Sequence, residues 1–172
     1  YGFDKPIPVQ YLIWLKRALM GDFGVSLQSN RPVIEEVIPA LRKTMMLAMV
    51  ATGLAFSVAF VLGVLAAYHN GTWMDRIFTG TAVIGVSVPN YWLSIVLVVI
   101  FSVELNWLPA VGMGPRGSGE WEWDLVHIRY LILPVIAVSA IPVGIITRTT
   151  RACVLEMLSQ EFVPALHSKG IT

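Results

Sequence analysis

The sequence predicts an all-α integral membrane protein. Of its 172 residues, 56% are hydrophobic and only 13% carry a charge, whereas soluble domains carry roughly 25% charged residues. The charges are also segregated, because the stretches 44–68, 77–103 and 130–147 contain none. About 20 apolar residues suffice to cross a hydrocarbon core as a helix. We therefore expect three membrane spans.

A short helix is predicted over residues 7–20. Pro8 suits the first turn of a helix, and Gly21 suits the position just beyond its end. The apolar residues gather on one face, with Lys16 and Arg17 beside them. Such a helix lies in a membrane interface or packs against its own protein, and the sequence leaves both interpretations open.

Two turn signals follow this helix. Residues 21–26 read Gly-Asp-Phe-Gly-Val-Ser, in which two glycines and a side-chain acceptor favour a tight loop. Arg31 and Pro32 then open a second short helix, which Pro39 is expected to bend. Residues 1–43 thus form one segment of short amphipathic helices ahead of the first span.

The first span, 44–68, carries a small residue at every fourth position. These residues are Ala51, Ala55, Ala59, Gly63 and Ala67. A stripe of small residues lets another helix approach closely. Alanine is common, so chance is an alternative, but five residues in register favour a helix-packing face. The connection at 69–76 contains the turn signal Asn70-Gly71 and is short, which predicts that the first two spans are antiparallel neighbours.

The second span, 77–103, has an irregular middle. It reads Ser87-Val88-Pro89-Asn90-Tyr91-Trp92, and a proline removes a backbone donor and disturbs the preceding turn. Backbone groups freed at membrane depth must be buried in protein or face a water-filled cavity. Ser87, Asn90, Tyr91 and Trp92 are therefore candidates for the lining of a pathway. The alternative is that Ser87 and Asn90 only satisfy the backbone that Pro89 loosens.

The third span is predicted over 130–147. A tryptophan-rich segment precedes it, and Trp107, Trp121 and Trp123 suit a membrane–water interface. Within the span, Ala140 and Gly144 repeat the small-residue spacing. Arg148 and Arg151 are expected to mark its polar end, followed by an amphipathic helix over 149–159 and a short polar helix closed by a glycine in the terminal segment, 160–172.

No arrangement of catalytic or metal-ligating residues stands out. The sequence has no His-Glu-x-x-His, Cys-x-x-Cys or Gly-x-Ser-x-Gly pattern, and no Asp or Glu lies inside a predicted span. We therefore expect no cofactor and no metal. The net charge of +1 gives no electrostatic footprint for nucleic acid. A pathway protein is favoured, because it needs only packed helices and an irregular lining. A membrane-embedded enzyme and a structural, non-transporting membrane subunit stay open as alternatives.

In this order the motifs resemble those of a known family, the permease subunits of bacterial ABC importers for dipeptides and oligopeptides, with their nickel and glutathione relatives. Residues 21–26 are similar to the family's Gly-Asp-Leu/Phe-Gly-x-Ser signature, and residues 87–92 to its Ser-Ile/Val-Pro-x-Phe/Tyr-Trp. Residues 107–110, Trp-Leu-Pro-Ala, and the pair Leu133-Pro134 match its external loop and the start of its next span.

The resemblance implies a type I ABC importer permease, a bundle of six spans of which three are present here. Residues 44–172 would be its permease domain, truncated at the C-terminal end, in the bacterial cytoplasmic (inner) membrane. The implied activity is import of peptides or similar small solutes by alternating access, without an ATPase of its own. The implied partners are a homologous second permease subunit, two ATPase subunits, an extracytoplasmic solute-binding protein and the lipid bilayer.

The terminal segment resembles the cytoplasmic loop that docks into the ATPase subunit of such importers. The resemblance assigns the coupling role to Glu161, Ala165, Lys169 and Gly170. The chain departs from the family pattern at Pro164 and Leu166, where a basic residue and a small alanine are usual.

The resemblance also implies an orientation. Residues 1–43 and 104–130 would face outward, with 69–76 and 148–172 in the cytoplasm. The positive-inside rule predicts the reverse, because eight of the twelve Lys and Arg residues lie in the outward segments. We follow the resemblance.

Overall fold

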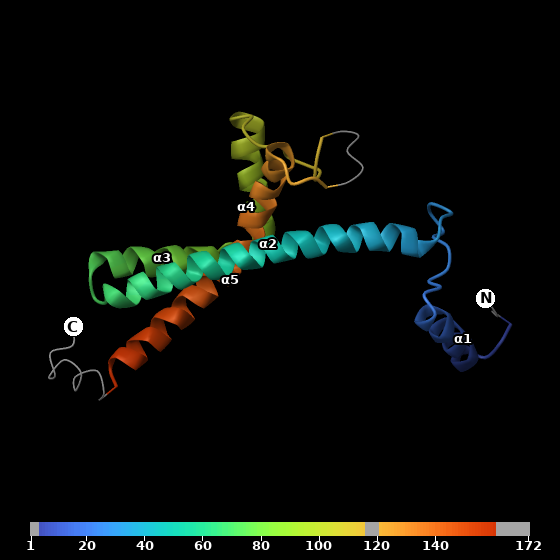
Figure 1. Ribbon diagram of the computed structural model, residues 1–172, viewed down its shortest axis with the longest axis horizontal. Coiled ribbons are helices and arrows are strands. Elements are labelled where there is room, and N and C mark those ends of the chain that lie inside the picture. Colours follow the sequence, from blue (N-terminus) through green and yellow to red (C-terminus); the bar gives the residue numbers. More distant parts are fainter. Residues whose placement is uncertain (1–3, 116–120, 161–172) are drawn as a thin grey trace. The chain divides into compact units, whose positions relative to one another are not determined.

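The computed structural model is helical throughout the residues that it describes, 4–115 and 121–160, apart from connecting turns and one isolated bridge. The elements are α1 (Ile7–Leu19), α2 (Val33–Tyr68), α3 (Trp73–Ser87), α4 (Asn90–Val98), the π-helix η1 (Val99–Glu104) and α5 (Leu125–Leu158) (Figure 1). α2 and α5 are each long and apolar enough to cross a membrane, and α3 with α4–η1 makes a third, broken candidate. The prediction of an all-α membrane protein is confirmed. The chain divides into two compact units, Tyr1–Met46 and Leu47–Thr172.

The first unit contains α1, a tight loop and the start of α2. α1 has a proline in its first turn, and Gly21 lies just beyond its end with φ of 83°. In the loop that follows, Gly24 has φ of 78° and donates its N–H to the Asp22 carboxylate at 3.0 Å. A bridge between Val25 and Pro32 closes the loop. The predicted helix and tight loop are both confirmed.

α2 is one helix where the sequence predicts two elements. α2 continues through Pro39 from Val33 to Tyr68, so the predicted short helix and the first span are joined without an interruption. Proline at position 39 leaves the Glu35 carbonyl without its intrahelical donor. Glu35 and the residues that follow it as far as Ala40 are exposed, so solvent can satisfy that carbonyl and the helix loses one bond only.

The small residues of α2 are buried, and two of them, Ala59 and Gly63, contact α5. All five members of the stripe are buried, and the alanines among them are at most 2% exposed. A Cβ added to Gly63 would stand 2.6 Å from the Thr150 Cβ and 2.8 Å from the Thr147 carbonyl oxygen. Thr147, itself buried, donates its hydroxyl to the Ala59 carbonyl at 3.4 Å. The two backbones therefore approach so closely that position 63 accepts only glycine without movement.

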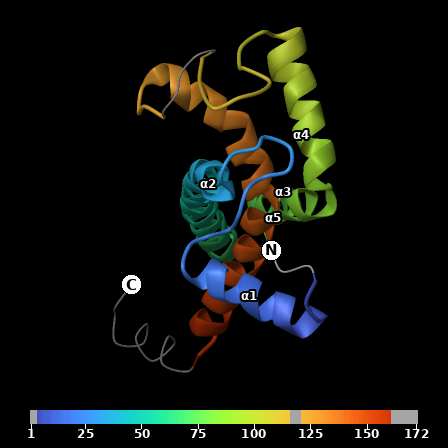
Figure 2. The same ribbon diagram turned by 90° about the vertical axis from the view of Figure 1, so that its right-hand side faces the viewer.

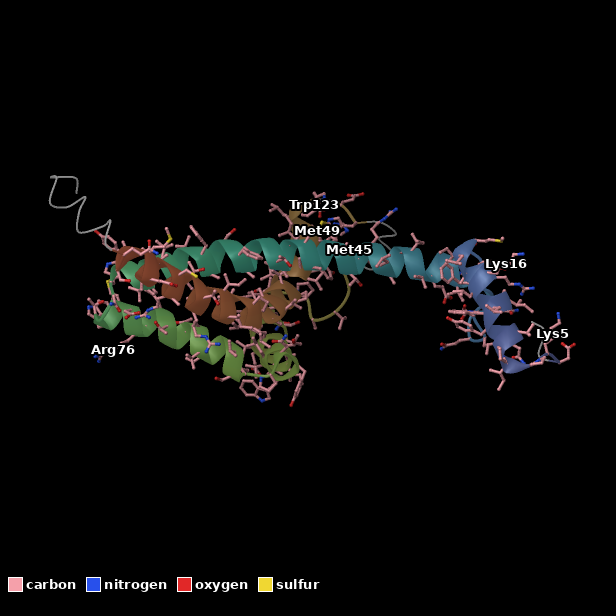
Figure 3. The ribbon with its side chains drawn as sticks, turned by 90° about the horizontal axis from the view of Figure 1, so that it is seen from below. Lys5, Lys16, Met45, Met49, Arg76 and Trp123 are labelled. Atoms are coloured by element: carbon pink, nitrogen blue, oxygen red, sulfur yellow. The ribbon has the colours of Figure 1, made fainter. Side chains whose placement is uncertain are left out.

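α5 is the central helix of the second unit, since it runs between α2 and α3 (Figures 2 and 3). The turn after α2 is tight, with Gly71 at φ of 80°, so α2 and α3 run antiparallel as predicted. Beyond the turn, however, α5 occupies the space between them. A Cβ on Gly144 of α5 would overlap the Ala82 carbonyl oxygen of α3, and a Cβ on Gly85 would stand 2.8 Å from the Ala140 carbonyl oxygen.

α5 is also longer than the predicted third span. It begins at Leu125, where the Asp124 carboxylate caps it by accepting the His127 N–H at 2.8 Å, and it continues to Leu158. The predicted span over 130–147 and the amphipathic helix over 149–159 therefore belong to one continuous helix. Charged residues do not end a helix by themselves, and Arg151 is held by a partner described below. Pro134 and Pro142 also lie inside the helix.

The second predicted span is broken in its middle, as expected. α3 begins at a Thr72 cap, and α4 begins immediately after Pro89, with a bend of 100° between α3 and the α4–η1 helix. α4 turns away from the line of α3 in Figure 1. Val88 is extended, with ψ of 124°, which is the conformation that a following proline favours.

Candidate functional site

The break between α3 and α4 leaves backbone groups without helical partners. Pro89 has no N–H to offer the Gly85 carbonyl. The first N–H groups of α4, from Asn90 to Trp92, have no preceding turn to bond to, and no side chain caps that end of α4. Leu93 is the first to bond back, donating to the Pro89 carbonyl at 3.0 Å. Donors and acceptors are thus left open at one bend in an apolar segment.

The four predicted pathway residues surround this bend but differ in what they do. Ser87, Tyr91 and Trp92 are exposed, the last two at 72% and 52%. Ser87 donates its hydroxyl to the Val83 carbonyl at 2.9 Å, one turn back in its own helix. The geometry at Ser87 is therefore that of a residue used by its own backbone.

Asn90 is the residue with unused hydrogen-bonding capacity. It is half-buried, and its Oδ1 atom is buried without a hydrogen-bond partner among the described residues. A buried amide oxygen left unpaired costs free energy. The Asn90 side-chain oxygen therefore accepts no hydrogen bond from the backbone at the break, and it is free to accept one from another group.

Two neighbouring cavities lie beside α4 and η1. The first, about 270 Å³, lies between α4, the loop after η1 and α5, with Ser94 and Val98 on one side and Tyr130, Leu133 and Pro134 on the other. The second, about 370 Å³, adds Ser102, Asn106 and Arg129, and both are lined by Pro109 and Tyr130. Ser94 lies one turn after Asn90 and donates to the Asn90 carbonyl at 2.8 Å. The hollow side of α4 therefore starts one turn beyond the break, on the face toward α5.

The start of α5 carries a small polar and aromatic cluster. His127 is 5% exposed, its Nδ1 contacts the Asp124 carboxylate, and Trp121 meets its ring edge-on at a centroid distance of 5.3 Å. The His127 N–H and ring hold the pKa of the Asp124 carboxyl below its ordinary value. These contacts fix the first turn of α5. Trp107 and Trp123 are 60% and 70% exposed, whereas Trp121 is half-buried in this cluster.

Near the other end of α5, Arg151 forms an ion pair with a buried carboxylate that the sequence analysis did not predict. The Arg151 guanidinium makes a bidentate contact with the Asp75 carboxylate. Its Nε donates to Oδ1 and its Nη2 donates to Oδ2, each at 2.7 Å. Asp75 is 6% exposed. The signal available in the sequence was that Asp75 is the only acid between Glu36 and Glu104. A lone carboxylate beside apolar spans requires a partner.

The predicted coupling residues Glu161, Ala165, Lys169 and Gly170 lie outside the described residues. Within residues 4–115 and 121–160, no group of three or more His, Cys, Asp or Glu side chains is placed to hold a metal ion.

Fold and site together define a multi-pass helical membrane protein with one interrupted span. Residues 59–172 match the family described as "Binding-protein-dependent transport system inner membrane component". The chain belongs to this family, which makes it a multi-pass component of the inner membrane. The family resemblance that the sequence motifs carry is thereby confirmed.

Among curated proteins, the chain is similar to several permeases, of which three are described here. It is 35% identical to the dipeptide transport system permease protein DppB of Alkalihalophilus pseudofirmus, covering 98% of this chain and 56% of that protein. It is 34% identical to the oligopeptide transport system permease protein AppB of Bacillus subtilis, with coverages of 99% and 54%. It is 32% identical to the glutathione transport system permease protein GsiC of Escherichia coli, with coverages of 99% and 52%. The chain spans about half the length of these relatives.

Proposed function

We propose that this chain belongs to the transmembrane permease subunit of an ATP-driven importer that moves peptides or similar small solutes by alternating access. The observation that carries the proposal is the 100° break between α3 and α4–η1 in a segment free of charge. Such breaks at membrane depth are suited to line a path, because their open backbone groups need water, protein or solute. The names of the similar permeases, for dipeptides, oligopeptides and glutathione, support the solute class.

The proposed importer has several further subunits. Family membership in binding-protein-dependent transport supports an extracytoplasmic binding protein and a source of ATP hydrolysis. We infer the finer composition, a homologous second permease and two ATPase subunits, from the same resemblance. The coupling contact would involve Glu161, Ala165, Lys169 and Gly170, and hydrolysis would belong to the ATPase subunits.

Asn90 is the pathway residue with the clearest experimental consequence. In the complete transporter with Cys153 replaced by serine, Asn90→Cys is expected to react with a small maleimide during transport, and an added dipeptide should slow that reaction several-fold. The reason is that the Asn90 amide oxygen is unpaired beside the open end of α4. Ser57→Cys is the matched control, and added dipeptide should not change its reaction rate. Ser57 is an exposed residue of α2 whose hydroxyl bonds within its own helix.

The same preparation tests the function itself. ATP-driven uptake of a labelled dipeptide into vesicles is expected with the binding protein present and is expected to stop without it. Absence of uptake, with a hydrolytic activity in the isolated subunit instead, would favour a membrane-embedded enzyme. If uptake occurs but Asn90→Cys is never protected, the pathway does not pass Asn90.

Orientation is a separate element of the proposal. We infer that residues 1–43 and 104–130 face outward and that the turn after α2 faces the cytoplasm. Val111, in the segment proposed to face outward, is 83% exposed, and Trp73, directly after the turn proposed to face the cytoplasm, is 69% exposed. In the same background, with Cys153 and every other cysteine of the transporter replaced by serine, an impermeant maleimide should label Val111→Cys in intact cells and Trp73→Cys only after permeabilisation. The opposite pattern would mean that the charge rule sets the orientation.

A further inference from the structure

The ion pair of Asp75 and Arg151 is the centre of a larger polar cluster, here called the Asp75 clamp. It consists of Asn70, Gly71, Asp75, Thr79 and Arg151. Arg151 Nη2 also donates to the Asn70 amide oxygen at 2.9 Å, the Gly71 N–H donates to Asp75 Oδ2 at 3.1 Å, and the Thr79 hydroxyl donates to Asp75 Oδ1 at 3.1 Å. The Asp75 carboxylate thus accepts from four groups on three segments: the turn after α2, the start of α3, and α5.

The net stability that such a pair supplies is small, because desolvation of two charges offsets most of their attraction. Its geometry is more informative. A bidentate guanidinium–carboxylate contact fixes the direction as well as the distance of the two side chains. The clamp therefore defines how the last two turns of α5 sit on the turn after α2 and on the start of α3.

Besides the clamp, two close backbone contacts hold α3 against α5. These are the contacts of Gly144 with Ala82 and of Gly85 with Ala140. At these two levels there is no space for a Cβ, so the helices cannot slide without separating. Gly85 lies two residues before the end of α3 at Ser87. The fastened region thus reaches from the end of α5 to the edge of the break.

The contact of α5 with α4 is different in kind. It encloses a cavity of about 270 Å³ between Ser94 and Val98 of α4 and Tyr130, Leu133 and Pro134 of α5. α4 is joined to α3 only through the extended residues Val88 and Pro89. Displacement is therefore easier between α4 and α5 than between α3 and α5.

We propose that the Asp75 clamp makes α3, the turn after α2 and the end of α5 one rigid body that carries movement from the end of α5 to the α3–α4 break. Asp75 and Arg151 are positioning residues for the transport cycle, which they influence without touching solute. The inference rests on the proposed function, since the movement at the end of α5 would come from the ATPase partner.

The first test measures rigidity and needs no transport. In the full transporter with Cys153 replaced by serine, spin labels at Ile77→Cys and Met157→Cys report the distance between the start of α3 and the end of α5; both positions are exposed. With Asp75 and Arg151 intact the distance distribution should be narrow, and Asp75→Asn or Arg151→Gln should broaden it. An unchanged distribution would overturn the proposal whether or not the wild-type protein transports.

The second test measures coupling. Asp75→Asn and Arg151→Gln should each lower ATP-driven dipeptide uptake per assembled transporter about tenfold, because each leaves a largely buried group without its partner, while ATP hydrolysis without solute persists. The double variant should be no worse than either single one, as expected of residues that act through each other. Uptake by Arg151→Lys should lie between that of the wild type and that of Arg151→Gln, since lysine keeps the charge but cannot make the bidentate contact.

Two arginines serve as matched controls. Arg148→Gln removes the same charge one turn earlier on α5, and Arg76→Gln removes a charge next to Asp75. Both side chains are exposed, and Arg76 points away from α3 in Figure 3. Each control should retain wild-type ATP-driven dipeptide uptake per assembled transporter. Equal losses in the controls and the clamp variants would overturn the proposal, because charge alone would then explain them.

Discussion

Replacing Gly144 by alanine is expected to destabilise the helical bundle by about 3 kcal/mol, near the upper end of the cost of overpacking a core. The added Cβ would overlap the Ala82 carbonyl oxygen and stand 2.5 Å from the Val86 Cγ2 atom. The first contact is with backbone, which no rotamer change relieves. α3 and α5 must therefore separate, and this separation outweighs the helix propensity of about 1 kcal/mol that alanine gains over glycine.

The structure supplies matched controls for this substitution. A Cβ on Gly80 or Gly53 would meet nothing within 4 Å, so Gly80→Ala and Gly53→Ala should keep or raise stability. Gly85→Ala, at 2.8 Å from one carbonyl oxygen, should fall between. The measurement is the unfolding midpoint of purified protein in detergent, together with the yield of folded protein from membranes. If Gly144→Ala unfolds at the same temperature as Gly80→Ala, α5 does not pack on α3 in this way.

The small-residue spacing predicts a face on which another helix can pack, but it does not predict which helix packs there. The stripe on α2 and the Ala140–Gly144 pair are visible in the sequence because small side chains recur at fixed helical positions. Their partners are Thr147 and Thr150 in one case and Ala82 and Val86 in the other. These are ordinary residues, and only the path of α5 between α2 and α3 selects them.

The prolines show the limit of local rules most clearly. Pro39, Pro134 and Pro142 lie inside continuous helices, whereas the chain breaks at Pro89. Each removes one backbone donor, so propensity alone does not separate them. What distinguishes Pro89 is the extended Val88 before it and the open first turn of α4 after it. The polar residues around position 89 predicted an irregular span there, and the break between α3 and α4 confirms it. The polar residues near Pro39 suggested a short helix separate from the first span, whereas the structure joins the two into one helix.

The ion pair of Asp75 and Arg151 could have been suspected but not assigned. A lone acid at the edge of apolar spans needs a cation, and Arg76, Arg148 and Arg151 were all candidates. Which of the three arginines reaches Asp75 depends on how the turn after α2 packs against α5. That packing depends on contacts between residues 76 positions apart, which periodicity does not encode.

Replacing Pro89 by alanine is expected to lower ATP-driven uptake more than about tenfold. Alanine restores an N–H that can donate to the Gly85 carbonyl and removes the steric restriction on Val88. A proline inside a helix costs about 3 kcal/mol, so the substitution favours a continuous α3–α4 helix by up to that amount. Straightening would close the open first turn of α4 and separate Ser94 from the α5 wall of the cavity that the two helices enclose.

The control for this prediction is Pro39→Ala, which alters a proline within a helix that is already continuous and should leave uptake unchanged. Spin labels at Thr81→Cys and Ile95→Cys, both exposed, should show a longer α3–α4 distance in Pro89→Ala than in the wild type. If the distance and the uptake both stay as they were, packing of α4 on α5 holds the bend without Pro89. If the distance lengthens and uptake is retained, the break does not line the path, and the proposed pathway must be placed elsewhere.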